Sequence, residues 1–183
     1  MPSLHESIEA AFRDVPYPGD DNLTVYNAEG RDYDETFQLL RGTVWKELCV
    51  DRFIHGDTPF PDLAPEAFHY FMPAFLTAIV DAAADDTVAD SLLFSLSPEN
   101  AKRTDGKFPY DNTAAYNQRM DLLTTMQRQV IVDVFYECHH RGWFCAEELE
   151  TVFPEINPRP DAVSYTHLRA HGDATLSRMP SSA

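Results

Sequence analysis

The chain has 183 residues, of which 44% are hydrophobic and 24% are charged, and its formal net charge at pH 7 is −16. This length and composition are typical of one globular domain. The negative charge disfavours binding to nucleic acids and to anionic membranes, and it favours cationic partners.

The first helix is expected over residues 4–14. Ser3 and Glu6 have the spacing of a capping box, in which each side chain bonds the backbone N–H of the other residue. The proline- and glycine-containing run at residues 16–22 should end this helix. Residues 23–26 could then form a short edge strand or an extended segment.

Two short helices are expected next, at residues 33–40 and 45–53. The clearest apolar stripe of the chain follows at residues 65–83, where Pro65 suits the first position of a helix. Pro73 lies inside this run. The helix should kink there or break into two, because proline lacks an N–H donor and clashes with the preceding turn.

Residues 88–96 predict a further short helix, and the polar run at residues 97–112 contains two prolines and a glycine that favour disorder. The second strong helix is expected over residues 125–141, after a capping box that begins at Thr124. Residues 146–152 predict a last short helix. The sequence therefore predicts an all-α, compact, multi-helix domain in which the two long apolar stripes pack together as a central pair.

The end of the chain has a different character. Residues 163–171 and 177–183 resemble a translated adapter of the kind used in sequencing libraries, with a short index between them. We therefore expect the single helical domain to cover residues 1–161 and residues 162–183 to be a disordered, adapter-derived tail. On this interpretation the true C-terminal sequence beyond Asp161 is unknown.

The cysteines and the apolar runs bear on the compartment. Cys49, Cys138 and Cys145 are an odd number without the spacing of a disulfide framework. The N-terminus lacks the basic and apolar regions of a secretory signal, and the longest apolar stretch, residues 67–80, is too short to span a bilayer. We expect a cytoplasmic protein with reduced thiols and no membrane partner.

Four possible zinc ligands lie close together in the sequence: Cys138, His139, His140 and Cys145. Their spacing fits no structural zinc motif. Cys138 lies on an apolar helix stripe, and the two histidines would complement the negative end of the helix dipole. A buried thiol without a metal is the preferred interpretation.

Glu66 and His69 have the spacing of one half of a di-iron motif, but di-iron bundles need this motif on two helices and two further carboxylates. The pattern occurs once, so no metal or cofactor is expected. The sequence also lacks the motifs of serine hydrolases, zinc proteases, phosphate-binding loops and dinucleotide-binding folds.

Four patches together, residues 10–23, 41–48, 63–76 and 123–131, resemble an uncharacterised bacterial family, domain-of-unknown-function family 6714. The third patch is the most specific, because Pro73 interrupts an otherwise helical aromatic run. The resemblance implies a small, largely helical protein and supplies no catalytic residues.

Three classes of function stay open, one of which is a purely structural subunit of an oligomer. The leading hypothesis is a small acidic protein that docks to another protein, with a basic protein as the expected partner, as immunity or accessory proteins do. The alternative is an enzyme with an unrecognised site near Trp45, Glu66 and Tyr70. With His69, these three residues form the candidate functional surface that the sequence suggests.

Overall fold

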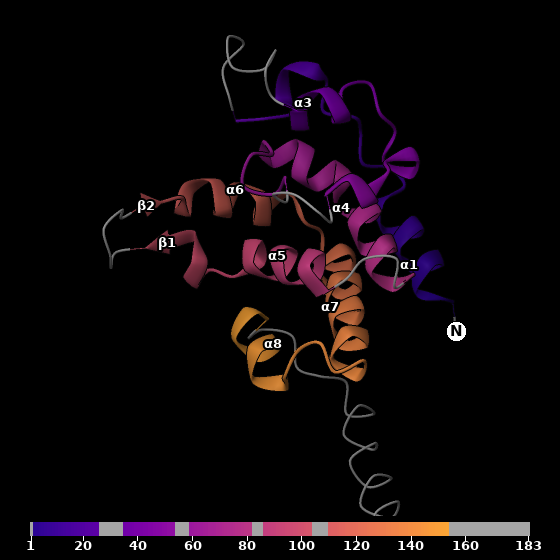
Figure 1. Cartoon of the computed structure of the whole chain (residues 1–183), viewed down its shortest axis with the longest axis vertical. Helices are drawn as coiled ribbons and strands as arrows, with labels where there is room; N and C mark the ends of the chain where they lie inside the picture. Colours follow the sequence, from indigo (N-terminus) through magenta and orange to yellow (C-terminus); the bar gives the residue numbers. More distant parts are fainter. Residues whose placement is uncertain (1, 26–34, 54–58, 82–85, 104–109, 154–183) are drawn as a thin grey trace, which may run out of the picture. The chain divides into compact units, whose positions relative to one another are not determined.

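The computed structural model of the protein describes residues 2–25, 35–53, 59–81, 86–103 and 110–153. These residues belong to one unit that ends at Phe153. Helices make up almost all of its regular structure (Figure 1), which confirms the all-α prediction. The expected domain boundary after Asp161, and the tail beyond it, lie outside the described residues.

Helix α1 (Leu4–Phe12) begins where the sequence predicted and ends two residues earlier. The capping box is present: the backbone N–H of Ser3 donates to Glu6 Oε2 at 2.7 Å, and the N–H of Glu6 donates to Ser3 Oγ at 3.2 Å. One face of the helix is buried, including Phe12. After the turn that follows α1, Thr24 forms a single antiparallel bridge with Leu63. Of the segment expected to be extended, Leu23 has helical backbone angles instead, φ −84° and ψ −43°.

Helix α3 (Glu35–Leu40) lies within the expected helix at 33–40. The predicted helix at 45–53 is wrong, because the chain forms two 3-10 turns instead, η2 (Trp45–Glu47) and η3 (Val50–Phe53). Leu48 between them has extended backbone angles, φ −66° and ψ 119°. This break in the helical path accompanies the burial of Val50 and Phe53 in the core.

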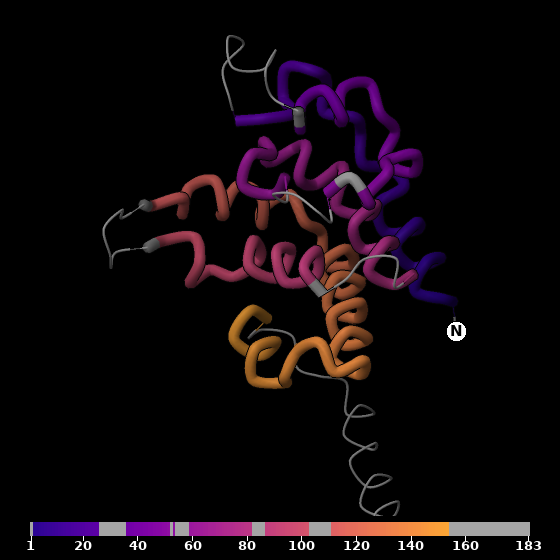
Figure 2. The backbone as a smooth tube through the Cα atoms, viewed as in Figure 1, coloured from indigo at the N-terminus to yellow at the C-terminus, as the bar shows by residue number. Residues whose placement is uncertain are grey.

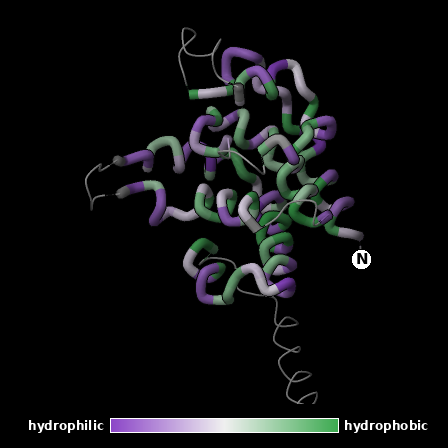
Figure 3. Tube along the Cα trace, viewed as in Figure 1, coloured by the Kyte–Doolittle hydropathy of each residue, from purple (hydrophilic) through white to green (hydrophobic). Residues whose placement is uncertain are grey.

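Helix α4 (Pro65–Val80) is the centre of the core. It contacts α1, η2 and η3, and hydrophobic positions are concentrated along it (Figure 3). The helix continues through Pro73, so of the two expected alternatives, a kink and a break into two helices, the break does not occur. Most of its residues are buried, and this packing offsets the roughly 3 kcal/mol that an interior proline costs.

Helix α5 (Asp86–Leu96) is followed by the turn η4 (Glu99–Ala101) and by two short antiparallel strands, β1 (Lys102–Arg103) and β2 (Tyr110–Asp111). The described part of the run at 97–112 is therefore ordered, contrary to the expected disorder. Helix α6 (Thr113–Leu122) was not predicted at all. It brings the chain back beside α5 and also contacts α4 (Figure 2).

Helix α7 (Thr125–His140) starts at the predicted capping box and contacts both α1 and α4. The expected pairing of the two long helices is confirmed. Arg141 follows the helix and donates from Nη1 to the carbonyl oxygen of Ile79 and from Nη2 to that of Val80, both at 2.8 Å. Arg141 thereby joins the end of α7 to the end of α4.

Helix α8 (Ala146–Val152) has the predicted bounds and packs near the end of α7. The rings of Phe144 and Phe153 lie 5.8 Å and 5.7 Å from the ring of Phe135, which is fully buried. Among the described helices, none combines the length and the hydrophobicity that crossing a bilayer requires.

Candidate functional site

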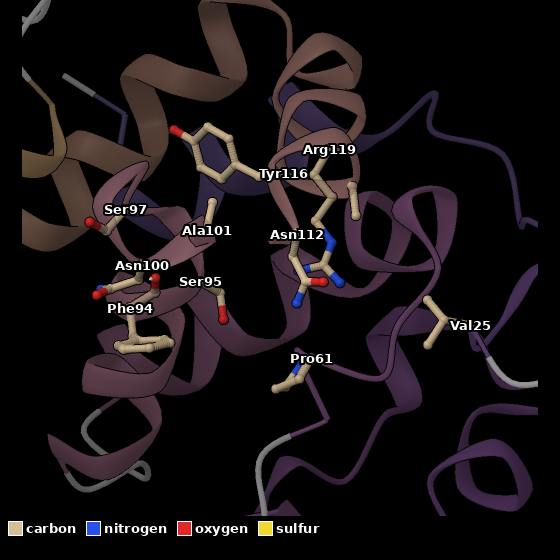
Figure 4. Close-up of a pocket in the computed structure, with 11 residues that line it drawn as sticks. Val25, Pro61, Phe94, Ser95, Ser97, Asn100, Ala101, Asn112, Tyr116 and Arg119 are labelled. Carbon is tan, nitrogen blue, oxygen red and sulfur yellow. Dashed lines mark hydrogen bonds between the residues drawn. The ribbon is translucent and has the colours of Figure 1, made fainter. Parts of the chain in front are cut away.

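A hollow of about 390 Å³ lies between α5, η4 and α6 (Figure 4). Its volume is within the range of pockets that hold small molecules. Phe94 and Ser95 contribute to it from α5, and Tyr116 and Arg119 contribute from α6. Pro61, in the turn before Leu63, closes a further side. We call this hollow the Arg119 pocket.

Contacts between distant segments hold the walls of the Arg119 pocket in place. The N–H of Asn112 donates to the carbonyl oxygen of Ala101 at 2.7 Å, and Tyr116 Oη donates to that of Leu96 at 3.3 Å. Asp111 accepts from the backbone N–H of Thr113 at 3.1 Å. The start of α6 is therefore fixed to the end of α5 and to η4.

The Asp111 carboxylate is also well defined electrostatically. Hydrogen bonds from Thr113 and an ion pair with Lys102, at 3.0 Å, lower its pKa to about 2. Asp111 is thus an anion that stabilises the start of α6, where the helix dipole favours negative charge. It does not line the pocket.

Arg119 is the one charged side chain among the described residues that line the Arg119 pocket. It is only 9% exposed, and its burial lowers the pKa of the guanidinium group. Nη2 donates to the carbonyl oxygen of Leu63 at 2.8 Å, and Cζ lies 4.8 Å from the centre of the Phe68 ring. Nε has no hydrogen-bond partner.

Buried charges in proteins are normally paired with an opposite charge. The described part of the chain places no carboxylate within ion-pair distance of Arg119. Its partners are a neutral carbonyl and an aromatic ring, and Figure 4 shows the side chain extending from α6 toward the centre of the lining residues. Within the part of the chain that the structure describes, the positive charge of Arg119 is therefore not balanced by a carboxylate.

A second hollow, of about 250 Å³, adjoins the first. The two share Pro61, Phe94 and Ser95, and the second adds Asp90 and Ser91. Phe94 is 53% exposed although it is a large aromatic side chain. We call the surface formed by these five residues the Phe94 surface.

Two of the four residues that the sequence singled out lie toward the core. His69 Nε2 is 3.0 Å from Gln127 Oε1, and burial lowers the pKa of the imidazole. Tyr70 is 6% exposed, and its ring packs edge-on against that of Tyr17 at 5.4 Å. Both side chains have structural neighbours that account for their positions.

The other two lie at the surface. Trp45, in η2, is half-buried, and the Lys46 amine lies 5.4 Å from the centre of its ring. Glu66 is exposed in the first turn of α4, where its charge complements the helix dipole. None of the four residues lines either hollow.

The cysteine and histidine cluster has structural roles as well. Cys138 is fully buried, as expected, and its burial raises the pKa of the thiol to about 11. His139 Nδ1 lies 2.7 Å from the carbonyl oxygen of Phe144. Within the described residues, no three His, Cys, Asp or Glu side chains are grouped so that they could hold a metal ion.

The fold and the site define an all-α protein with a pocket of ligand size beside an exposed aromatic side chain. The model of a family of unknown function, DUF6714, matches residues 1–141, so the chain belongs to this family. The match includes α1 to α7 and all the residues that line the two hollows. No curated protein and no solved structure matches the chain.

Proposed function

We propose that this protein is an acidic docking protein that binds a basic partner protein through the Phe94 surface. The observation that carries the proposal is the 53% exposure of Phe94 between two hollows, in a chain whose net charge is −16. Aromatic side chains that fill or flank pockets provide much of the binding energy of protein interfaces.

Charge complementarity defines the partner. Asp90 lies one turn before Phe94 on α5 and lines the second hollow. Together with the overall negative charge, it favours a polypeptide that presents basic residues around an apolar side chain. Opposite charges accelerate association and set orientation, and this contribution weakens as salt is added.

The cytoplasm is the compartment that we propose for this docking. Cys49 and Cys145 are exposed free thiols. Exposed thiols persist in a reducing compartment, whereas secreted proteins usually pair them in disulfides.

Affinity capture from an extract of the source organism tests the proposal with two matched variants. Phe94→Ser removes the exposed aromatic ring of α5, and Met126→Ser removes a side chain of similar exposure, 55%, from α7. We expect basic proteins to be retained by the wild type and by Met126→Ser. They should be lost with Phe94→Ser, and also when salt is raised from about 50 mM to about 300 mM.

Two results would contradict the proposal. One is the capture of the same proteins by Phe94→Ser and by the wild type. The other is a dimer in sedimentation analysis that dissociates on Phe94→Ser, because the surface would then belong to a second copy of this chain.

A further inference from the structure

Two buried polar atoms in the described residues lack a hydrogen-bond partner, Thr24 Oγ1 and Arg119 Nε. Both lie around Leu63: Thr24 pairs with Leu63 in the isolated bridge, and Arg119 donates to its carbonyl oxygen at 2.8 Å. Buried polar atoms in native proteins are nearly always satisfied, by protein, by water or by a ligand. Arg119 also lines the pocket, so its guanidinium group has unused hydrogen-bonding capacity at this site.

The positive charge of Arg119 limits the chemical groups that a ligand of this pocket could present to it. A guanidinium group stays protonated at neutral pH and pairs best with a carboxylate or a phosphate, which it can bind through two parallel hydrogen bonds. Phosphate sites usually combine several donors or cations, and Arg119 is the one cation among the lining residues that the structure describes. A carboxylate therefore suits this pocket better than a phosphate does.

The other residues that line the pocket indicate the chemistry of the rest of the ligand. Pro61, Phe94, Ala115 and Tyr116 supply apolar surface, and Ser95 and Asn112 supply neutral polar groups. None of the described lining residues is acidic, although Asp and Glu outnumber Lys and Arg by 30 to 14 in the whole chain. The volume of about 390 Å³ suits a small molecule with one ring or a short alkyl chain.

We infer that the Arg119 pocket binds a small organic carboxylate, with its negative group at Arg119 and its apolar part against Tyr116 and the other apolar walls. This site goes beyond the docking of a protein at the Phe94 surface. It needs Arg119, which lies inside the pocket and is not part of that surface.

Calorimetric titration with matched probes tests the inference. Phenylacetate and hexanoate each have a neutral amide of the same shape, phenylacetamide and hexanamide. We expect saturable binding of the acids that is at least about tenfold tighter than that of the amides, because only the acids provide a charge-assisted bond. Inorganic phosphate should bind more weakly than either acid.

Single substitutions test whether the acids bind in the Arg119 pocket. Ala115→Leu fills the pocket from α6 without removing Arg119, and Ala114→Leu places the same side chain at an exposed position of the same helix. We expect Ala115→Leu and Arg119→Met to weaken phenylacetate binding at least about tenfold, while Ala114→Leu binds like the wild type. If Arg119→Met fails to fold, the comparison of Ala115→Leu with Ala114→Leu still shows whether phenylacetate binds in the pocket.

Three outcomes would overturn the inference: no saturable binding of either acid, equal binding of acid and amide, or unchanged binding in Ala115→Leu. Phosphate that binds as tightly as phenylacetate would overturn it as well. These outcomes are independent of the docking proposal, which depends on Phe94→Ser and on captured proteins.

One further comparison separates two sources of the carboxylate. N-acetyl-glycyl-leucine presents the C-terminal carboxylate of a polypeptide, and its C-terminal amide is the control. If the peptide acid binds more tightly than phenylacetate, the ligand is a polypeptide C-terminus. If it binds more weakly, the ligand is a free small acid, and both results agree with a carboxylate site.

Discussion

Nε2 of His69 lies 3.0 Å from Oε1 of Gln127, 58 residues further along the chain, and this contact joins the middle of α4 to the start of α7. The same Oε1 accepts from the N–H of Thr124 at 2.9 Å, and Nε2 of Gln127 donates to the carbonyl oxygen of Ala11 at 3.0 Å. Since Oε1 can only accept, Nε2 of His69 is the donor in this contact. One buried amide thus connects three helices.

Replacing Gln127 with alanine should destabilise the fold. The carbonyl of Ala11 and the imidazole of His69 would each lose a buried partner, and we expect the free energy of unfolding to fall by about 2 kcal/mol or more. Gln129→Ala, on the same helix, removes a partly buried bond to Asp133 and should cost less than about 0.5 kcal/mol. Chemical denaturation measures both, and equal costs would refute the connecting role of Gln127.

Stability should depend on the protonation of His69. Burial lowers its pKa in the folded protein below the ordinary value of 6.5, and the bond to Gln127 opposes this only in part. The unfolded chain therefore binds the proton more readily, so the contribution of neutral His69 is present above pH 6.5 and is lost as the pH falls below it.

We expect the free energy of unfolding to decrease from pH 6.5 toward pH 4.5, which is the ordinary pKa of a glutamate such as Glu6. The His69→Gln variant should show a shallower decrease over this range. Urea denaturation at each pH gives the two slopes. Parallel slopes would mean that His69 does not titrate differently in the two states.

The core helices should be sensitive to the loss of a ring. Phe75 in α4 and Phe135 in α7 are both 0% exposed, so Phe75→Ala and Phe135→Ala should each cost about 3 to 5 kcal/mol. Phe94→Ala is the matched control, because Phe94 is 53% exposed, and it should cost less than about 1 kcal/mol. Melting temperatures within a degree or two of the wild type for either core variant would contradict the pairing of α4 and α7.

The adapter-like tail should contribute nothing to stability. Residues 162–183 lie outside the described residues, and their larger apolar side chains are Val163, Tyr165, Leu168, Leu176 and Met179. So little apolar surface does not offset roughly 1 to 2 kcal/mol of backbone entropy per residue. Deletion of residues 162–183 should leave the melting temperature unchanged.

A longer deletion provides the control. Removal of residues 142–183 also takes away Phe144, Phe153 and α8, which cover Phe135, and should lower the melting temperature clearly. A clear loss of stability from the shorter deletion would show that the tail is native protein sequence.

Local signals made most of the helices predictable. The capping boxes at Ser3 and Thr124 act between residues three positions apart, so the starts of α1 and α7 could be located from the sequence alone. The apolar stripe of α4 was equally clear. The helix expected at 45–53 failed because one extended residue, Leu48, is enough to interrupt a helix.

Helix α6 shows what the sequence could not reveal. It has no apolar stripe. Its start is held by hydrogen bonds to the carbonyl oxygens of Ala101 and Leu96, which lie in the preceding turn and helix and not in α6 itself. Periodicity therefore gave no sign of it. Arg119 was missed for a different reason, since a charged residue is expected in solvent unless its burial is seen.

The candidate surface was predicted less well than the fold. Sequence reasoning grouped Trp45, Glu66, His69 and Tyr70, three of which lie on α4 within two turns. Helical spacing does not say which residue of such a group faces a neighbouring helix, and Tyr70 faces Tyr17. The pocket instead depends on α5 and α6, whose pairing is a tertiary contact.

The two bonds from Arg141 to Ile79 and Val80 also bear on the order of folding. Helix α4 has no basic residue in its last turn, and these bonds supply donors for its final carbonyls from a position 61 or 62 residues away. Closing such a long loop carries an entropic cost that no local contact repays. The Asp81 N–H also donates to the carbonyl oxygens of Thr77 and Ile79, so the last turn has a local cap that the docking of α7 reinforces. A peptide of residues 65–80, which lacks both Asp81 and Arg141, should therefore fray at its C-terminal end.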